Sequence, residues 1–322
     1  MDGLVTVFGG SGFVGVQVVR ALAKAGWRIR VAARRPGLAY RLRMLGDVGQ
    51  IELMQANVRD PASVGRALDG AQACVNAVGQ AVETGRQRFL SVHHLGAQAV
   101  AQAAAARGLT RYVHLSGLGA DEAAASRYAQ SRGLGEVVTR SAMPSATILR
   151  PSVVFGPEDQ VFNSLAAMTQ WAPAIPLFGG GHTRFAPVYV ADVAAAVAAA
   201  LGDAQAAGKT YELGGPGVFS FRALVELVMR QTGHERPLIA LPFNVAGWMG
   251  TGFEILARFG IAPVITADQV ILLKSDAVPA PDAPGLAALG VTATALEAIL
   301  PTYLYRYRRG GQFAEMTAAA QR

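Results

Sequence analysis

The chain has 322 residues, of which 52% are hydrophobic and 16% charged, and its formal net charge is +7. This length accommodates one large α/β domain with an appended lobe, or two domains. The single cysteine, Cys74, excludes a disulfide framework and a cysteine-based zinc site, and its apolar surroundings predict a buried thiol. The positive charge could favour nucleic acid, but no predicted helix combines a dense basic face with aromatic residues, so nucleic-acid binding is not expected. An anionic lipid surface or an acidic protein partner fits the charge better.

The N-terminal segment carries the strongest motif. Residues 4–8 form an apolar run of strand length, residues 9–15 read Gly-Gly-Ser-Gly-Phe-Val-Gly, and helical periodicity follows. This order predicts a dinucleotide-binding fold in which Gly9 makes the turn, Gly12 admits a pyrophosphate and Gly15 packs the helix on the sheet. The amides at the helix N-terminus then face the phosphates. The cofactor-binding residues predicted here are Gly9, Ser11, Gly12, Phe13, Val14 and Gly15.

The end of the next predicted strand, residues 28–33, indicates which dinucleotide is bound. Arg34 and Arg35 follow this strand, and no acidic residue stands there. Folds that bind NAD place an Asp or Glu here for the ribose 2′-hydroxyl, whereas an arginine accommodates the 2′-phosphate of NADP. The sequence therefore predicts NADP(H), with NAD(H) as the less favoured cofactor. The alternative, a solvated basic turn, stays open.

Two further predicted strands end at the same edge of the sheet. The strand at 50–55 leads into Asn57, which could reach the adenine, and the strand at 73–79 ends in a glycine. Because the carboxyl ends of parallel strands form the ligand crevice of open α/β sheets, both ends belong to the predicted site. They contribute Asn57, Val58, Ala77, Val78 and Gly79.

The middle of the chain supplies candidate catalytic residues. A long helix is predicted over about 86–107; its His93 and His94 point in different directions, so they are expected to be packing or surface residues, and no metal site is predicted. The fifth predicted strand, 111–116, ends in Ser116. The following helix carries Tyr128 and Arg132 on one face, four residues apart. A sixth strand ends at Pro151, which also belongs to the predicted cofactor site.

Several motifs together resemble the extended short-chain dehydrogenase/reductase family. They are the glycine motif, the Asn-Ala-x-Gly strand end, the serine after the fifth strand, the Tyr-x-x-x-basic helix and the Leu-Arg-Pro-x-x-Val-Phe-Gly-Pro segment. Within it, the chain resembles the atypical branch of nucleotide-binding accessory subunits of respiratory complex I, through residues 45–50, 126–128, 155–164, 187–193 and 284–290. The resemblance implies an α/β fold with a doubly wound parallel sheet of the Rossmann type, a smaller, mainly helical C-terminal lobe, and complex I subunits as partners.

The resemblance also implies roles for the polar residues near the nicotinamide. Reductases of the family use a tyrosine as proton donor, a lysine four residues later, a serine and often an asparagine. By position, Tyr128 matches the tyrosine, Ser116 approximately the serine, and His93 the asparagine. Arg132 stands at the lysine position; it can bind ribose hydroxyls, yet it has no accessible neutral form with which to relay a proton. Tyr128 is therefore either a ribose-binding residue without chemistry or a catalytic acid.

The second half of the chain is expected to form most of the smaller lobe. We expect the Rossmann domain to span 1–155, joined by 186–215, and the lobe to span 156–185 and 216–322. Two lobe segments join aromatic and basic residues, namely a predicted helix at 244–259 and the stretch at 303–309. Such segments suit an anionic membrane surface. The alternative is that both only pack the lobe.

The sequence thus favours an NADPH-binding accessory or assembly protein of complex I that is non-catalytic or weakly catalytic. One alternative is a soluble NADPH-dependent reductase or epimerase that uses Tyr128 and Ser116, and another is a redox-sensing regulator. The first strand follows Met1 within three residues, and no apolar window of about 20 residues lacks charges or helix breakers. We therefore expect a bacterial cytoplasmic protein, at most peripheral on the inner membrane.

Overall fold

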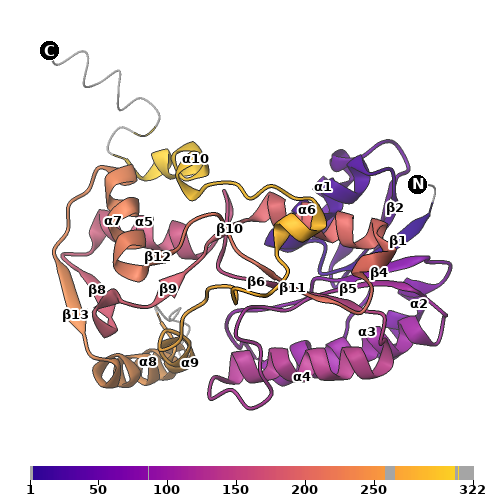
Figure 1. The fold of residues 1–322 in the computed structure, drawn as a ribbon, viewed down its shortest axis with the longest axis horizontal. Helices are drawn as coiled ribbons and strands as arrows, with labels where there is room; N and C mark the ends of the chain where they lie inside the picture. Colours follow the sequence, from indigo (N-terminus) through magenta and orange to yellow (C-terminus); the bar gives the residue numbers. More distant parts are fainter. Residues whose placement is uncertain (1–2, 86, 258–264, 309–310, 312–322) are drawn as a thin grey trace, which may run out of the picture. The chain divides into compact units, whose positions relative to one another are not determined.

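The computed structural model describes residues 3–85, 87–257, 265–308 and 311, and the chain divides into two compact units (Figure 1). The segment at 279–292, which the sequence analysis assigned to the smaller lobe, belongs to unit 1. Each unit therefore combines segments that lie far apart in the sequence. Unit 1 comprises Met1–Pro151, Val190–Leu213 and Pro279–Thr292; unit 2 comprises Ser152–Tyr189, Gly214–Val278 and Ala293–Arg322.

Unit 1 is built on a seven-stranded sheet whose strands are all parallel. Their order is β11-β6-β5-β4-β1-β2-β3. The order reverses between β1 and β4, which is where open α/β sheets bind ligands. The predicted doubly wound parallel sheet is therefore confirmed. The strands are β1 (Leu4–Phe8), β2 (Arg28–Ala33), β3 (Ile51–Gln55), β4 (Ala73–Asn76), β5 (Arg111–Leu115), β6 (Thr147–Pro151) and β11 (Thr210–Leu213).

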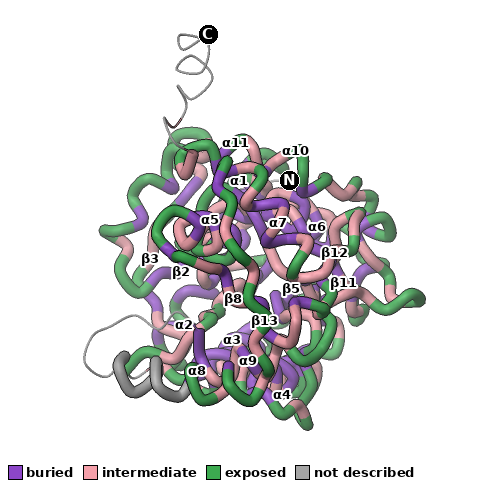
Figure 2. The backbone as a smooth tube through the Cα atoms, turned by 90° about the vertical axis from the view of Figure 1, so that its left-hand side faces the viewer, coloured by how far each residue is buried: buried purple, intermediate pink, exposed green. Residues whose placement is uncertain are grey.

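Helices cover both faces of this sheet. Figure 1 shows α1 and α6 on one face and α2, α3 and α4 on the other. Because both faces are covered, the central strands read as continuous apolar runs and are buried almost throughout, as β5 shows in Figure 2. The helices are α1 (Phe13–Lys24), η1 (Pro36–Leu45), α2 (Pro61–Leu68), η2 (Leu90–His94), α3 (Leu95–Ala105), α4 (Arg127–Ala142), α6 (Val190–Gly202), η4 (Ala204–Ala206) and η5 (Leu286–Leu289).

The connection after β4 differs from the helix predicted over 86–107. A short bridge joins Thr84 to Gln87, and the helix begins with a π-helical turn, η2, before it continues as α3. A π-turn inserts an extra residue into the helix, and such turns occur frequently at functional sites. This turn places His93 in the interior, whereas His94 is only half-buried.

Unit 2 combines helices with three two-stranded sheets around its own apolar core. Strand β7 pairs with β10 and β8 with β13 in parallel, while β9 and β12 are antiparallel. Phe155, Phe162, Leu224, Val228 and Leu304 are among its buried core residues. The elements are β7 (Val154–Phe155), α5 (Val161–Trp171), β8 (Ile175–Phe178), η3 (Gly179–Gly181), β9 (Arg184–Phe185), β10 (Val188–Tyr189), β12 (Phe219–Ser220), α7 (Phe221–Thr232), β13 (Leu238–Leu241), α8 (Phe243–Ala257), α9 (Ala267–Leu272), α10 (Leu296–Ile299), α11 (Pro301–Leu304) and η6 (Tyr305–Tyr307).

The C-terminal helices close the core of unit 2 through a buried polar contact. The Tyr303 hydroxyl donates to Oδ2 of Asp159 at 2.5 Å, and the same carboxylate accepts the amides of Gly156 and Phe162 at 3.1 and 2.7 Å. Burial raises the pKa of Asp159, and these hydrogen bonds act in the opposite direction. The carboxylate is thus buried with the donors that such a group requires.

The predicted membrane contact at 303–309 is corrected for part of the described residues 303–308. Tyr303 and Leu304 are buried in the core, and Arg308 Nε donates to the carbonyl of Gln231 at 2.6 Å. Packing of the lobe therefore accounts for Tyr303, Leu304 and Arg308. Tyr305 and Arg306 are exposed, so the membrane contact stays a prediction for them; residue 309 lies outside the described part.

The helix predicted at 244–259 is α8, and residues 258 and 259 lie outside the described part. Its residues Ala246 and Gly250 are buried, and a Cβ on Gly250 would lie 2.6 Å from Ala267 N at the start of α9. This packing leaves Trp248 81% exposed. In the part of the chain that the structure describes, no helix is both long and apolar enough to span a bilayer.

Candidate nucleotide-binding and catalytic site

The turn between β1 and α1 requires glycine at two positions and leaves a third open. Gly9 has a φ of +78°, and a Cβ on it would lie 2.6 Å from the carbonyl oxygen of Ala77. A Cβ on Gly15 would lie 2.7 Å from Gly10 Cα and would overlap the Gly9 carbonyl. At Gly12, by contrast, a Cβ would meet only Gly9 O, at 3.4 Å. The fold does not itself require glycine at Gly12, and a closely approaching pyrophosphate would.

The N-terminus of α1 has no cap of its own. Gly12 is the N-cap residue and supplies no side-chain hydrogen bond, and the first turn contains no acidic residue. The first amides of a helix lack partners within it, and the helix dipole makes this end attractive to anions. Phe13 and Val14 open the helix and present such amides. This end of α1 therefore fits a phosphate group.

A pocket opens at the carboxyl ends of the central strands. Nine of the predicted cofactor residues line it, while the predicted Phe13, Val14, Gly15, Arg35, Tyr128, Arg132 and Pro151 are not among its lining residues. Of these, Arg35 is the N-cap of η1, and the carbonyl of Pro151 accepts the amide of Leu118. The lining residues are Phe8, Gly9, Ser11, Gly12, Ala32, Ala33, Arg34, Ala56, Asn57, Val58, Arg59, Ala77, Val78, Gly79, Gln80, Gln87 and Val92.

Two arginines and no carboxylate line this pocket. Arg34 follows β2, and Arg59 follows β3; both are exposed, and sequence reasoning missed Arg59. Its place two residues after Asn57, in the turn after a strand, was the available signal. Asn57 shapes that turn, because its Oδ1 accepts the amide of Arg59 at 3.1 Å. Sequence reasoning also missed Gln87 as a residue that lines the pocket. Its position depends on how the loop after β4 folds, and neighbouring residues in the sequence do not reveal that.

The Arg132 side chain is held in a buried cradle beside Tyr128. Its Nη1 donates to the carbonyl of Leu115 at 2.9 Å, and its Cζ lies 5.3 Å from the centre of the Tyr128 ring. A Cβ on Gly79 would overlap Arg132 Nη2 and lie 3.2 Å from its Cζ. Glycine at 79 is therefore what allows the guanidinium to approach the end of β4, next to the pocket.

Two buried polar atoms beside this cradle lack a partner among the described residues. They are Arg132 Nε and the Ser116 Oγ. Buried polar groups almost always form hydrogen bonds, so such a pair is expected where a ligand binds. The Tyr128 hydroxyl lies on the same side of the sheet, 3.7 Å from where a Cβ on Gly117 would stand. The uncapped α1, the open side of Gly12 and these donors fit a dinucleotide.

His93 is a neutral structural residue of this site. Its Nε2 accepts the amide of Gln80 at 3.1 Å, so the ring proton is on Nδ1, which donates to Ser131 Oγ at 2.9 Å. Burial, followed by the charge of Arg132, lowers the pKa of His93 to about 2. Its ring also packs edge-on against Tyr128, with centroids 5.5 Å apart. His93 therefore orients the tyrosine and the loop after β4, and it carries no second proton and no charge at neutral pH.

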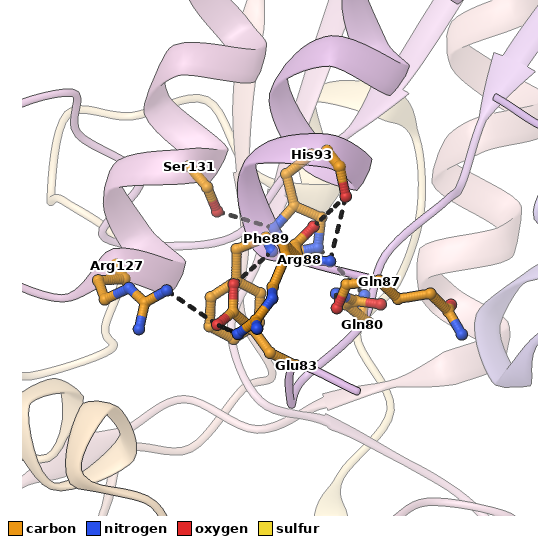
Figure 3. A network of polar contacts seen from close by, with 9 residues as sticks. Gln80, Glu83, Gln87, Arg88, Phe89, His93, Arg127 and Ser131 are labelled. Atoms are coloured by element: carbon orange, nitrogen blue, oxygen red, sulfur yellow. Dashed lines mark hydrogen bonds and ion pairs between the residues drawn. The ribbon is translucent and has the colours of Figure 1, made fainter. Parts of the chain in front are cut away.

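Glu83 ties the loop after β4 to the start of α4 (Figure 3). Its carboxylate accepts the amide of Phe89 at 2.8 Å and binds Arg127 at 2.8 Å and Arg88 at 3.4 Å. The Phe89 ring in turn packs against Tyr128, at 5.6 Å between centroids. Figure 3 shows Gln80 and Gln87 of the same loop, both of which line the pocket. One carboxylate therefore positions a pocket wall and a neighbour of the tyrosine.

The arrangement can hold a nucleotide and can orient a phenol, and the two described polar groups packed against that phenol, Arg132 and His93, are poorly suited to exchange protons with it. Arg132 is a permanent cation with several donors and no acceptor. His93 is neutral and has both ring nitrogens engaged.

Comparison with known proteins shows a protein family that the chain matches and individual proteins to which it is similar. The model of the NAD-dependent epimerase/dehydratase family matches residues 5–214. The chain is similar to the mitochondrial NADH dehydrogenase (ubiquinone) 1 alpha subcomplex subunit 9 of Arabidopsis thaliana. The two are 34% identical over 314 aligned residues, which cover 95% of this chain and 78% of that protein. It is also 34% identical over 197 residues to the ceramide reductase of Caulobacter vibrioides, covering 61% of this chain and 60% of that protein.

Solved structures show the same fold. The NADPH-dependent quinone oxidoreductase QOR2 of Escherichia coli, complexed with NADPH, superposes with a TM-score of 0.72 at 21% identity, over 91% of this chain and 97% of that one. Other structures of this fold contain NAD. The shared fold therefore binds NAD(P) in general, and the choice between the two cofactors depends on local residues.

Proposed function

Because this chain belongs to the NAD-dependent epimerase/dehydratase family, we propose that it binds NADP(H) and serves as a weakly catalytic or non-catalytic accessory protein of respiratory complex I. The observation that carries the proposal is the cradle of Arg132. A permanent cation held by Leu115 and covered by Gly79 offers donors to ribose hydroxyls. The same cation cannot accept and return a proton as the family's lysine does. Binding is thus supported and repeated turnover is not.

Preference for NADP(H) over NAD(H) follows from the rim of the pocket. Arg34 and Arg59 line it, and no carboxylate does. A charge-assisted hydrogen bond contributes about 1.5–3 kcal/mol, which corresponds to roughly ten- to hundredfold tighter binding of the phosphorylated cofactor. Calorimetric titration of the purified chain with NADPH and NADH measures this ratio.

Three arginine variants make the cofactor test specific. Arg34→Ser and Arg59→Ser are each expected to reduce the preference for NADPH. Arg222→Ser is the matched control, because Arg222 is an exposed arginine of α7 and does not line the pocket. Equal affinities for NADPH and NADH in the unaltered chain would refute the assignment of NADP.

The accessory role rests on the mitochondrial relatives, whose name identifies them as subunits of the NADH dehydrogenase. In this proposal the protein is bacterial, lies on the cytoplasmic side, and associates with complex I subunits at the inner membrane. The exposed Trp248 on α8 is a candidate contact for such a subunit. Native gel electrophoresis of mildly solubilised membranes should show the chain migrating with complex I activity. A chain that is expressed but never comigrates would exclude the role.

A second candidate, a soluble NADPH-dependent reductase, is favoured by two observations: Ser116 Oγ is buried without a partner among the described residues, and the Tyr128 hydroxyl lies 3.7 Å from where a Cβ on the next residue, Gly117, would stand. The similarity to a protein named ceramide reductase agrees with it over part of the chain. The bound dinucleotide would supply a hydride to a carbonyl carbon, while Tyr128 donates a proton to the oxygen and Ser116 orients it. NADPH oxidation with ketone substrates that Tyr128→Phe abolishes and Arg132→Lys increases would favour this function over the accessory role.

A further inference from the structure

The connection between β2 and β3 contains an element that the nucleotide site does not use. This element is η1 (Pro36–Leu45), a 3₁₀ helix with three residues per turn. At that period Ala39 and Leu42 fall on one face, and both are buried in unit 1. The residues between them must then point away from the unit, so η1 has one inward face and two outward faces.

The outward faces of η1 and the turn after it are apolar to an unusual degree. Leu38 is 77% exposed, Tyr40 60%, Met44 80% and Val48 107%. Single exposed apolar residues are ordinary on protein surfaces, but four large ones within eleven residues form a patch. Leu38 and Met44 are six residues apart and therefore share one face of a helix with a period of three.

Arginines alternate with these apolar residues. Arg41 is exposed and stands between Leu38 and Met44 on their face. Arg43 is also exposed, and its Cζ lies 5.2 Å from the centre of the Tyr40 ring on the next face. Asp47 is the single acidic residue between positions 34 and 48. We call Leu38, Tyr40, Arg41, Arg43, Met44 and Val48 the η1 surface.

We infer that the η1 surface binds shallowly to an anionic lipid bilayer. Apolar side chains can enter the level of the acyl boundary, while arginines with long apolar stems keep their charge among the lipid phosphates. Positive charge of this density is complementary to an anionic leaflet, and the period of three presents both kinds of side chain on the same outward faces. The η1 surface is a lipid contact distinct from residues 303–308, of which Tyr303, Leu304 and Arg308 are used within unit 2.

The η1 surface is separate from the nucleotide pocket. Arg34, which lines the pocket, lies before η1, and the residues of the η1 surface are absent from the pocket lining. Substitutions in the η1 surface should therefore leave the affinity for NADPH unchanged. Lipid binding and nucleotide binding can then be tested on the same protein.

Flotation of the full chain with vesicles tests the inference. With NADPH present, the protein should float with vesicles of phosphatidylcholine and phosphatidylglycerol (7:3) at 0.1 M NaCl. It should not float with phosphatidylcholine alone, and 0.5 M NaCl should release it, because salt screens exposed charges. Arg41→Ser/Arg43→Ser is expected to weaken binding about 25-fold, from about fivefold for each arginine. Leu38→Ser/Met44→Ser should weaken it about tenfold.

A matched control removes the same charge elsewhere. Arg222 and Arg230 are exposed arginines of α7 in unit 2, and Arg222→Ser/Arg230→Ser should float like the unaltered chain. Unchanged NADPH affinity shows that each variant is folded. Equal flotation with neutral vesicles, or full flotation of the Arg41→Ser/Arg43→Ser variant, would overturn the inference.

A label gives a second readout. The chain's own cysteine, Cys74, is buried, so a polarity-sensitive dye will react with the thiol introduced by Met44→Cys. A blue shift of its emission on addition of anionic vesicles supports insertion. No shift with vesicles, together with a shift on addition of purified complex I, would show that the η1 surface binds protein and would overturn the lipid assignment.

Discussion

Replacing Gly12 by alanine separates nucleotide binding from folding. Gly12 has φ −81° and ψ 174°, which alanine adopts without strain. The new Cβ would meet only Gly9 O, at an ordinary 3.4 Å. Alanine stabilises by about 0.4–1 kcal/mol through the unfolded chain and loses a similar amount as an N-cap. The melting temperature without ligand should therefore change by only a few degrees.

The substitution should instead weaken nucleotide binding, and with it the stabilisation that the bound nucleotide gives. If the pyrophosphate lies against Gly12, the Cβ occupies its place, and we expect roughly hundredfold weaker binding. At a ligand concentration of 1,000 times the original dissociation constant, stabilisation falls from about 4.1 to about 1.4 kcal/mol. For a domain of about 150–250 residues this lowers the shift in melting temperature from roughly 8–16 °C to roughly 3–6 °C.

Differential scanning fluorimetry with and without NADPH measures both quantities. The matched control is Gly15→Ala, whose Cβ would overlap backbone atoms. This overlap should reduce the free energy of unfolding by about 1–3 kcal/mol or more, so the melting temperature should fall even without ligand. A Gly12→Ala protein with the full NADPH-induced shift would refute the reasoning, because it would show that no ligand atom lies close to Gly12.

Three further results are expected. Glu83→Ala should speed release of NADPH about fivefold in stopped-flow displacement, because about 1 kcal/mol of hydrogen bonding no longer holds the pocket wall; unchanged release would remove Glu83 from that role. Burial lowers the pKa of His93 to about 2 and of His114 to about 3, so both are neutral when folded and bind protons when unfolded below about pH 6.5. Urea unfolding should therefore show stability that is intact above pH 6.5 and falls by about 1.4 kcal/mol per histidine per pH unit below it, and His93→Gln should reduce this slope. Tyr303→Phe removes a donor from buried Asp159 and should lower unfolding free energy by about 1–3 kcal/mol; an unchanged value would show that water replaces the hydroxyl.

The parts of the fold that could be predicted from sequence are those specified by local pattern. The glycine turn and the strands of the sheet follow from residues that are neighbours in the chain, and the doubly wound parallel sheet follows from the motif they form. The π-turn at Leu90–His94 could not be predicted, because it depends on partners of His93 at Gln80 and Ser131. A period of 3.6 fits the same residues equally well.

The candidate site was predictable in composition and not in arrangement. Arg132 was identifiable as a departure from the family's lysine, whereas its contact with Leu115 and the need for glycine at 79 depend on strands far apart in sequence. The prediction of a membrane contact is wrong at Tyr303 for a related reason. A run of tyrosines and arginines has the same composition whether it meets lipid or a buried carboxylate, and only the position of Asp159 decides between them.

The contact between Asp159 and Tyr303 also determines how late in translation unit 2 can complete its core. The two residues are 144 positions apart, and ribosomes add about 5–20 residues per second. Tyr303 is therefore synthesised roughly 7–30 s after Asp159, and the carboxylate lacks this donor until then. Unit 1 waits as well, since Pro279–Thr292 belongs to it. A premature stop near residue 300 would retain every segment of unit 1 and remove Tyr303, so it should leave unit 2, and not unit 1, open to proteases.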